Sequence, residues 1–321
     1  MAGTCAHVEF LRAAGLGAGA SRREPPRGRP RHPPRALGLC RVPPPRQAPP
    51  PPLRRLGRRH RRHRRYRPRH GVPPRLAAAG LGLVLVGRNL EKLAAVAAEI
   101  KAKHPDVPEV RTFVLDFAAE RLAAGVEAEA LKEAIRGLDV GVLVNNTGLS
   151  YPYARYFHEV DEELMRSLTR VNVEGVTRVT HAVLPGMVER KHGAMVNIGS
   201  GSASVIPSDP MYSVYAATKA YVDQFSRCLY VEYKSKGIDV QCQVPLYVAT
   251  KMASIRKSSF MVPSADINIG YEPMCTPYWP HSIMWFFISI LPESFINNLR
   301  LGMCIKIRKK GLAKDTKKKS F

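Results

Sequence analysis

The stretch LGLVLVGR, residues 81–88, is a continuous apolar run that ends in a glycine and an arginine. Such a run is typical of a parallel strand that is buried on both faces. Four further predicted strands follow along the chain, at residues 110–115, 140–144, 194–198 and 238–244. Segments with helical spacing separate them, at residues 93–100, 122–135, 162–190 and 215–234. Strands that alternate with helices predict an α/β fold with a doubly wound parallel sheet.

Polar residues follow the predicted strands at the points where the strands end. They are Arg88, Asp116, Asn145 and Ser200. In an open parallel sheet, ligands bind at the carboxyl ends of the strands. The sequence therefore predicts a binding site along this edge.

Residues 215–219 are Y-A-A-T-K, so Tyr215 and Lys219 are spaced to share one helix face. A free tyrosine has a pKa of about 10. A neighbouring ammonium group favours the phenolate and lowers that pKa, which makes the phenol a better proton donor to a carbonyl oxygen. Taken alone, the motif equally suits a tyrosine and a lysine on a surface helix.

Three further motifs precede this one in a fixed order: Asn145-Asn146-Thr147-Gly148, Asn172 within a helix, and Asn197-Ile198-Gly199-Ser200-Gly201-Ser202. The set resembles the short-chain dehydrogenase/reductase family with its Rossmann fold. Residues 145–168, 183–233, 239–252 and 307–319 resemble one branch more closely, the very-long-chain 3-oxoacyl-CoA reductases of fatty-acid elongation. Hydroxysteroid dehydrogenases of the same branch are the near neighbours.

The resemblance implies catalytic roles. Tyr215 would donate a proton to the substrate carbonyl oxygen, Lys219 would lower the Tyr215 pKa and hold the nicotinamide ribose, and Asn172 would fix a water in the proton relay. A serine would polarise the carbonyl. Ser200 matches that serine by its place after the strand, whereas Ser202 matches its usual distance of thirteen residues from the tyrosine. We prefer Ser200.

The implied cofactor is NADPH. Asn145 would line its site, together with the two residues of the Y-x-x-x-K motif, and Asp116 would lie against the adenine. Arg88 stands where an NAD enzyme has an acid and would pair with a 2′-phosphate. An ordinary charge at a helix N-terminus is the alternative for Arg88. Thr250 belongs to a stretch that resembles the loop over the nicotinamide amide.

The first 75 residues differ in composition from the rest. They contain twenty arginines, no lysine, fifteen of the 27 prolines and only two acids, Glu9 and Glu24, in a chain of 321 residues with a net charge of +24. Such a segment lacks the apolar residues for a core, which predicts disorder. We therefore expect three parts: residues 1–75, a reductase domain at 76–306 and a basic tail at 307–321.

A shifted reading frame offers another origin for this composition. Back-translated and moved one base downstream, residues 56–72 permit the string WAVVTGATDGIGRAMAF, which contains T-G-x-x-x-G-I-G. Such a turn brings a pyrophosphate to backbone N–H groups at a helix N-terminus. The chain itself has no T-G-x-x-x-G-x-G motif. We therefore expect the first strand and glycine turn to be missing, and NADPH to bind poorly.

The implied setting is the cytosolic face of the endoplasmic reticulum membrane, with a long-chain acyl-CoA as substrate and elongase proteins as partners. Lys318 and Lys319 lie at the positions of a dilysine retrieval signal. Residues 283–291, IMWFFISIL, are too few to span a bilayer and suit either a membrane interface or a buried helix. The six scattered cysteines show no metal-ligand spacing and fit a reducing compartment.

Two alternatives remain at this point. One is a hydroxysteroid dehydrogenase, which the motifs do not separate from an acyl-CoA reductase. The other is a non-catalytic protein whose arginine-rich segment binds nucleic acid. The order of the motifs favours the reductase, so we expect no nucleic-acid partner.

Overall fold

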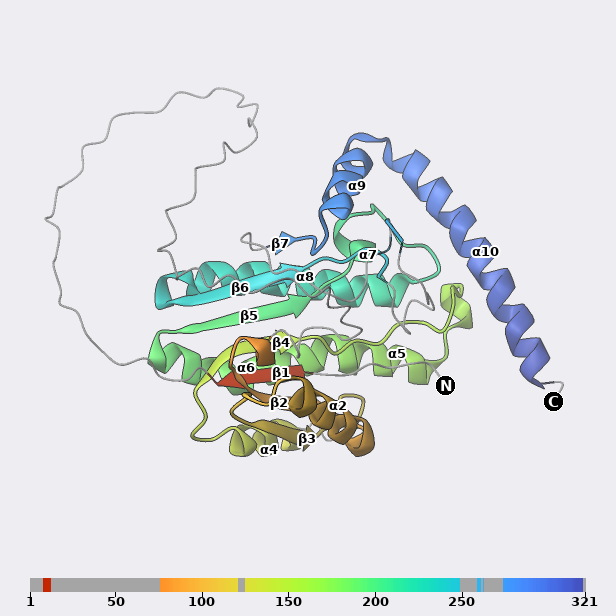
Figure 1. Ribbon diagram of the computed structural model, residues 1–321. Helices are drawn as coiled ribbons and strands as arrows, with labels where there is room; N and C mark the ends of the chain where they lie inside the picture. Colours follow the sequence, from red (N-terminus) through yellow and green to blue (C-terminus); the bar gives the residue numbers. More distant parts are fainter. Residues whose placement is uncertain are drawn as a thin grey trace, which may run out of the picture. The chain divides into compact units, whose positions relative to one another are not determined.

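The computed structural model describes residues 8–12, 76–120, 125–248, 259, 260, 262 and 274–319, with side chains described from residue 76 to 316 (Figure 1). The predicted disordered segment 1–75, apart from residues 8–12, and Thr250 lie outside this part of the chain.

The described strands form one seven-stranded sheet in the order β3-β2-β1-β4-β5-β6-β7. Their bounds are β1 Val8–Arg12, β2 Gly82–Gly87, β3 Val110–Val114, β4 Val140–Asn145, β5 Gly193–Ile198, β6 Ile238–Gln243 and β7 Met274–Cys275. Neighbouring strands are parallel except at β1. The prediction of a doubly wound sheet is thus confirmed, and each predicted strand lies within one or two residues of its observed position.

The centre of the sheet differs from the prediction. We expected its first strand to be missing, with the edges of its neighbours exposed. Instead β1 fills this position and is antiparallel to both β2 and β4. Arg12 pairs with Gly82 and Val140 at the amino ends of those strands, and Val8 pairs with Val86 and Asn145 at their carboxyl ends. Backbone pairing of β2 and β4 requires only an extended segment, and it does not require the glycine turn.

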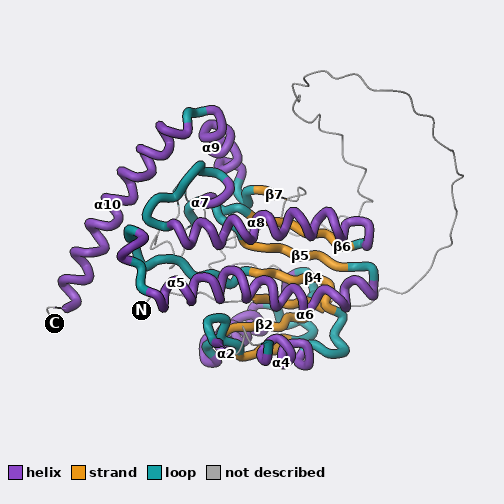
Figure 2. The backbone as a smooth tube through the Cα atoms, turned by 180° about the vertical axis from the view of Figure 1, so that it is seen from behind, coloured by secondary structure: helices purple, strands orange, loops and turns teal. Residues whose placement is uncertain are grey.

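Helices cover both faces of the sheet. The described helices are α2 Leu90–Lys103, α4 Val126–Ala134, α5 Glu162–Thr169, α6 Gly175–Arg190, α7 Gly201–Ser204, α8 Ser213–Tyr233, α9 Trp279–Ile290 and α10 Glu293–Lys319. Short 3-10 turns lie at Phe157–Glu159 and Lys234–Lys236. α2 lies in front of the sheet in Figure 1, whereas α6 and α8 lie in front of it in the reverse view of Figure 2.

Strand β2 shows how the core is divided. Leu83 and Leu85 pack with Leu93 of α2 on one face. Val84 and Val86 belong to the cluster formed with α4, α6 and α8 on the other face. Alternate residues of a strand point to opposite faces, so an entirely apolar strand is what a sheet covered on both sides requires.

The predicted long helix at 162–190 is continuous but not regular. α5 passes into a π-helical turn at Arg170–Glu174, and α6 follows it directly. π turns inside helices occur mostly at functional sites. This turn contains Asn172, one of the predicted site residues.

The C-terminal part consists of two helices. The apolar run at 283–291 lies mostly within α9, and α10 runs without a break through the predicted domain boundary at residue 306. In the described part of the chain, every helix is either too short or too polar to cross a membrane.

Candidate active site

The Y-x-x-x-K motif lies in the first turns of α8, beside the end of β5. Tyr215 is the third residue of α8, and Lys219 follows one helical turn later. Lys219 Nζ donates to the carbonyl oxygen of Ile198, the last residue of β5, over 2.8 Å. The structure therefore brings the motif to the predicted carboxyl edge of the sheet.

Burial controls the ionisation of both groups. Lys219 is only 5% exposed, and burial lowers its pKa to about 8. Burial also raises the pKa of Tyr215, while its hydrogen bond with the Ser200 side chain acts in the opposite direction. The pKa of Tyr215 is thus raised in this structure, where the sequence analysis expected Lys219 to lower it, because the loss of solvation dominates. A neutral phenol is the form that can donate a proton.

Ser200 is the serine beside the tyrosine. Its side chain is buried and lies close enough to Tyr215 to lower the pKa of the phenol, whereas Ser202 is only partly buried. Ser200 also caps α7, with its Oγ accepting from the backbone N–H of Ser202 over 3.2 Å. The geometry favours Ser200 as the group that contacts a carbonyl oxygen shared with Tyr215.

A glycine sets the close approach of two loops at this point. The Gly201 backbone N–H donates to Pro245 O over 2.9 Å. A Cβ at Gly201 would lie 2.3 Å from Leu246 Cδ2, which is far inside contact distance. The loop after β6 can therefore pack directly against the turn that contains Ser200.

Asn172 is fully buried at the π turn and links two elements of the site. Its Oδ1 accepts from Leu149 N over 2.8 Å, and its Nδ2 donates to Leu149 O and Thr218 Oγ1, each over 2.9 Å. Thr218 immediately precedes Lys219. The amide of Asn172 therefore fixes the loop after β4 against the catalytic turn of α8, and the structure does not test its predicted water.

Asn145 belongs to a buried polar network at the end of β4. Its Nδ2 donates to Thr180 Oγ1 over 3.0 Å and to Asn197 Oδ1 over 2.7 Å, and Asn197 in turn donates to Ser226. Within the described residues, Asn145 Oδ1 and Thr147 Oγ1 are buried without a hydrogen-bond partner. A buried acceptor and a buried hydroxyl without partners are costly, so this edge suits a ligand with polar groups.

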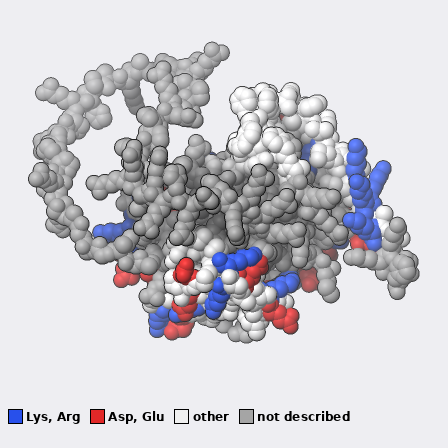
Figure 3. Space-filling model, viewed as in Figure 1, with Lys and Arg blue, Asp and Glu red and all other residues white. Residues whose placement is uncertain are grey.

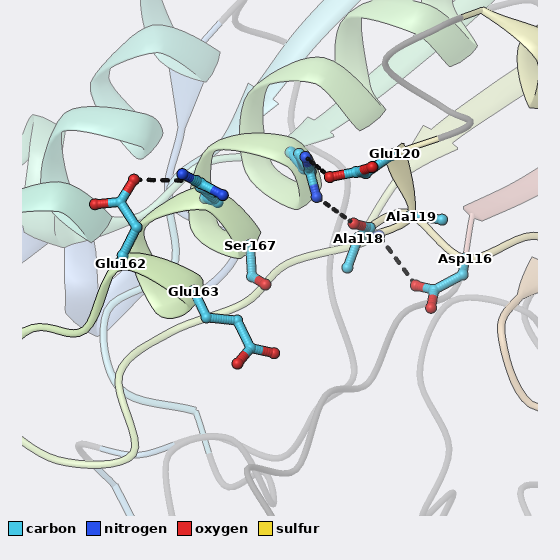
Figure 4. A pocket seen from close by; sticks show the side chains of 9 residues that line it. Asp116, Ala118, Ala119, Glu120, Glu162, Glu163 and Ser167 are labelled. Carbon is cyan, nitrogen blue, oxygen red and sulfur yellow. Dashed lines mark hydrogen bonds and ion pairs between the residues drawn. The ribbon is translucent and has the colours of Figure 1, made fainter.

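Arg88 and Asp116, two further predicted cofactor residues, lie along the same edge. Arg88 is exposed between β2 and the N-cap of α2, Asn89. Asp116 follows β3 and accepts from Ala118 N over 3.0 Å. It lines a cavity of about 490 Å³ between the segment after β3 and α5 (Figure 4). The residues described as lining this cavity include neither Tyr215 nor Lys219.

One group of residues was not predicted. Asp209, in the loop before α8, is buried and forms an ion pair of 2.7 Å with Arg300 of α10. Arg300 also donates to Tyr247 Oη over 2.6 Å. The negative charge of Asp209 raises the Tyr215 pKa further. The partners are 91 residues apart, so local sequence spacing carried no signal of their contact.

The arrangement is suited to proton donation onto a carbonyl oxygen. The neutral phenol of Tyr215 and the hydroxyl of Ser200 lie together at the carboxyl end of β5. The buried amine of Lys219 lies one helical turn further along α8. Two hydroxyl donors that meet at one point can hold and then neutralise the oxygen of a ketone as it gains charge.

Comparisons with known proteins agree with this geometry. The family described as short chain dehydrogenase matches residues 71–259. A very-long-chain 3-oxoacyl-CoA reductase-like protein of Arabidopsis thaliana is 44% identical over 244 residues, which cover 73% of this chain and 76% of the relative. The very-long-chain 3-oxoacyl-CoA reductase of Rattus norvegicus is 41% identical over 251 residues, covering 75% and 78%.

A solved structure shows the same similarity. The short-chain dehydrogenase of Sphingobium yanoikuyae, in complex with NADPH, is 29% identical with a TM-score of 0.51. The similarity covers 60% of this chain and 73% of that one.

Proposed function

The chain belongs to the short-chain dehydrogenase family, as an oxidoreductase that acts on C=O and CH–OH groups, and we propose that it reduces a very-long-chain 3-oxoacyl-CoA to the 3-hydroxyacyl-CoA with NADPH. The observation that carries the reaction is that Tyr215 and Ser200 interact at the carboxyl end of β5, where Lys219 binds Ile198 O. The names of the similar reductases support the choice of substrate.

Each residue of the site has a separate role in carbonyl reduction. The Ser200 hydroxyl donates to the substrate C3 oxygen and orients it toward Tyr215. The Tyr215 hydroxyl delivers the proton that converts this oxygen into a hydroxyl. NADPH, when bound, supplies the hydride. Lys219, held on Ile198 O and one helical turn after Tyr215 in α8, provides a readily protonated amine at the site, which favours reprotonation of Tyr215 after turnover.

The described residues fit one half of NADPH better than the other. Lys219 and the unpartnered Asn145 Oδ1 and Thr147 Oγ1 provide polar groups for a nicotinamide ribose. Arg88, exposed after β2, suits a 2′-phosphate. Among the described residues nothing forms a glycine turn for the pyrophosphate, since the sequence has no T-G-x-x-x-G-x-G and β1 runs antiparallel. We therefore propose weak NADPH binding by this chain.

The proposed setting is the cytosolic face of the endoplasmic reticulum membrane, beside other elongation proteins. The similarity to very-long-chain 3-oxoacyl-CoA reductases, whose substrates carry long acyl chains, supports this location. Long acyl chains are poorly soluble in water, which also favours a reductase that works at a membrane.

The test is the reduction of 3-oxoacyl-CoA substrates of increasing chain length. The rate is measured as the oxidation of NADPH at a saturating concentration of the cofactor. We expect turnover that rises with chain length and that falls by roughly 10²- to 10⁴-fold in Tyr215→Phe, since only the proton donor is removed. Steroid ketones serve as the comparison substrates. Faster turnover of a steroid than of any acyl-CoA would overturn the proposed substrate, and full activity of Tyr215→Phe would overturn the mechanism.

A further inference from the structure

Helix α9 is apolar on both of its faces. It has no Asp, Glu, Lys or Arg between Trp279 and Ile290. Its inner face packs Trp285 and Ile288 against the core cluster that contains Val244. Its outer face exposes five large apolar side chains at helical spacing: Trp279, Ile283, Phe286, Phe287 and Ile290. A helix that is apolar all round is normally covered on every side.

The exposed apolar surface continues onto α10. The exposed residues there and in the preceding turn are Leu291, Phe295, Leu299 and Met303. The opposite face of α10 is docked on the protein, because Ile296 and Cys304 are buried and Arg300 binds Asp209. We call the exposed residues from Trp279 to Met303 the α9–α10 surface, which is the white region over these helices in Figure 3.

The docking of α10 continues along its length and fixes which face points outward. Arg308 forms an ion pair with Glu159, and the Tyr153 hydroxyl donates to Asp315 over 2.8 Å. Gly311 lies against the Tyr153 ring, where a Cβ would be 2.2 Å from Cγ. The α9–α10 surface therefore cannot turn inward without breaking these contacts.

Positive charge follows the apolar residues along α10. Exposed lysines occupy the next turns, at Lys306, Lys309, Lys310 and Lys314. Figure 3 shows Lys and Arg side chains in blue beside the white region. Tryptophan and phenylalanine flanked by lysine are the composition of a surface that lies in the headgroup region of a bilayer, where lysine meets lipid phosphate.

We infer that the α9–α10 surface docks on a lipid bilayer, with its aromatic side chains at the level of the headgroups and its lysines on the phosphates. Soluble monomers rarely expose contiguous apolar patches of this kind. A second copy of the chain would also cover the apolar residues. A bilayer, in addition, offers phosphate groups to the lysine row that follows the apolar residues.

The two tryptophans of the chain make a direct test possible, because both are in α9. In a Trp285→Phe variant of the full chain, Trp279 is the single reporter and lies on the proposed surface. The probe is vesicles of phosphatidylcholine alone, since the arginine-rich first 75 residues would bind anionic lipid independently. We expect a blue shift of Trp279 emission on vesicle addition and quenching by brominated phosphatidylcholine.

A matched pair of variants in this background locates the contact. Phe286 and Phe157 are 61% and 62% exposed, but only Phe286 belongs to the α9–α10 surface. We expect Phe286→Ser to weaken vesicle partition by about tenfold or more, and Phe157→Ser to leave it unchanged. Thermal melts verify that both variants fold.

Three outcomes overturn the inference. The first is Trp279 emission that vesicles do not shift or quench. The second is an equal effect of the two serine variants. The third is a dimer in sedimentation experiments without lipid that Phe286→Ser dissociates, which would make the surface a contact between two copies.

Discussion

Arg300 Nε donates to Asp209 Oδ1 over 2.7 Å, and 12% of the arginine side chain and 1% of the aspartate side chain are exposed. The pair joins α10 to the loop before α8. Asp209 lies close enough to Tyr215 to raise its pKa. The guanidinium therefore offsets a negative charge that would otherwise act more strongly on the catalytic phenol.

Arg300→Met should leave a buried carboxylate without its partner. We expect the free energy of unfolding to fall by roughly 3–5 kcal/mol, measured by chemical denaturation. Arg227→Met is the control, since the partly exposed pair of Arg227 with Asp223 should be worth about 1 kcal/mol or less. The double variant Asp209→Asn, Arg300→Met should recover part of the loss. Equal losses in the two single variants would show that burial of the Asp209 pair is not decisive.

Lys219 should make stability rise at alkaline pH. Its folded-state pKa is about 8, and the ordinary value is 10.5. Between these values the unfolded chain binds a proton that the folded protein does not, so the free energy of unfolding increases with pH across this window. Below pH 8 both states bind the proton, and the cost of its burial is fully present. We expect the stability difference between wild type and Lys219→Met to shift in favour of wild type from pH 8 to pH 10.5. A difference that stays flat across this range would contradict the lowered pKa.

Substitution of the two candidate serines should have different effects on kcat. Ser200→Ala removes the hydroxyl that meets Tyr215, and we expect kcat to fall by roughly 10²-fold with little change in stability. Ser202→Ala retains the backbone N–H that Ser200 Oγ accepts from, and should keep most of the activity. A larger loss in Ser202→Ala than in Ser200→Ala would reverse the assignment.

The missing glycine turn should limit cofactor affinity. We expect the chain as it stands to bind NADPH more weakly than micromolar, measured by titration of nicotinamide fluorescence. Replacing residues 56–72 with WAVVTGATDGIGRAMAF should tighten binding by at least about tenfold, because the turn supplies N–H groups and a helix dipole to the pyrophosphate. Micromolar binding by the unaltered chain would refute the expectation. The cognate transcript tests the shifted reading frame separately. A transcript that encodes the arginine run in frame would refute the hypothesis of a frame shift.

The sequence predicted those parts of the fold that depend on local pattern. β2 and β4 are recognisable because a strand buried on both faces is almost entirely apolar, and β5 and β6 follow them in the regular alternation of strands with helices. The Y-x-x-x-K pair was recognisable because four residues make about one helical turn, which places both side chains on the same face. Its position beside Ser200 followed from the rule that loops at the carboxyl edge of a parallel sheet converge.

Other features depend on contacts that no local pattern records. The π turn at Arg170–Glu174 has the same apolar spacing as the helices beside it, so periodicity could not reveal it. The raised Tyr215 pKa depends on burial and on Asp209, which only the folded chain brings together. The antiparallel pairing of Val8–Arg12 depends on the unpaired edges of β2 and β4, which attract any suitable extended segment.

The direction of β1 separates two tasks that one strand usually performs together. Filling the position between β2 and β4 requires only backbone pairing, and β1 provides this pairing although it is antiparallel to both strands. Delivering a phosphate-binding loop to the catalytic edge is a matter of polarity, and a reversed strand releases the chain at the opposite rim, beside Gly82 and Val140. The central position of the sheet is therefore occupied, but the described part of β1 does not lead into a phosphate-binding loop at the carboxyl edge of the sheet.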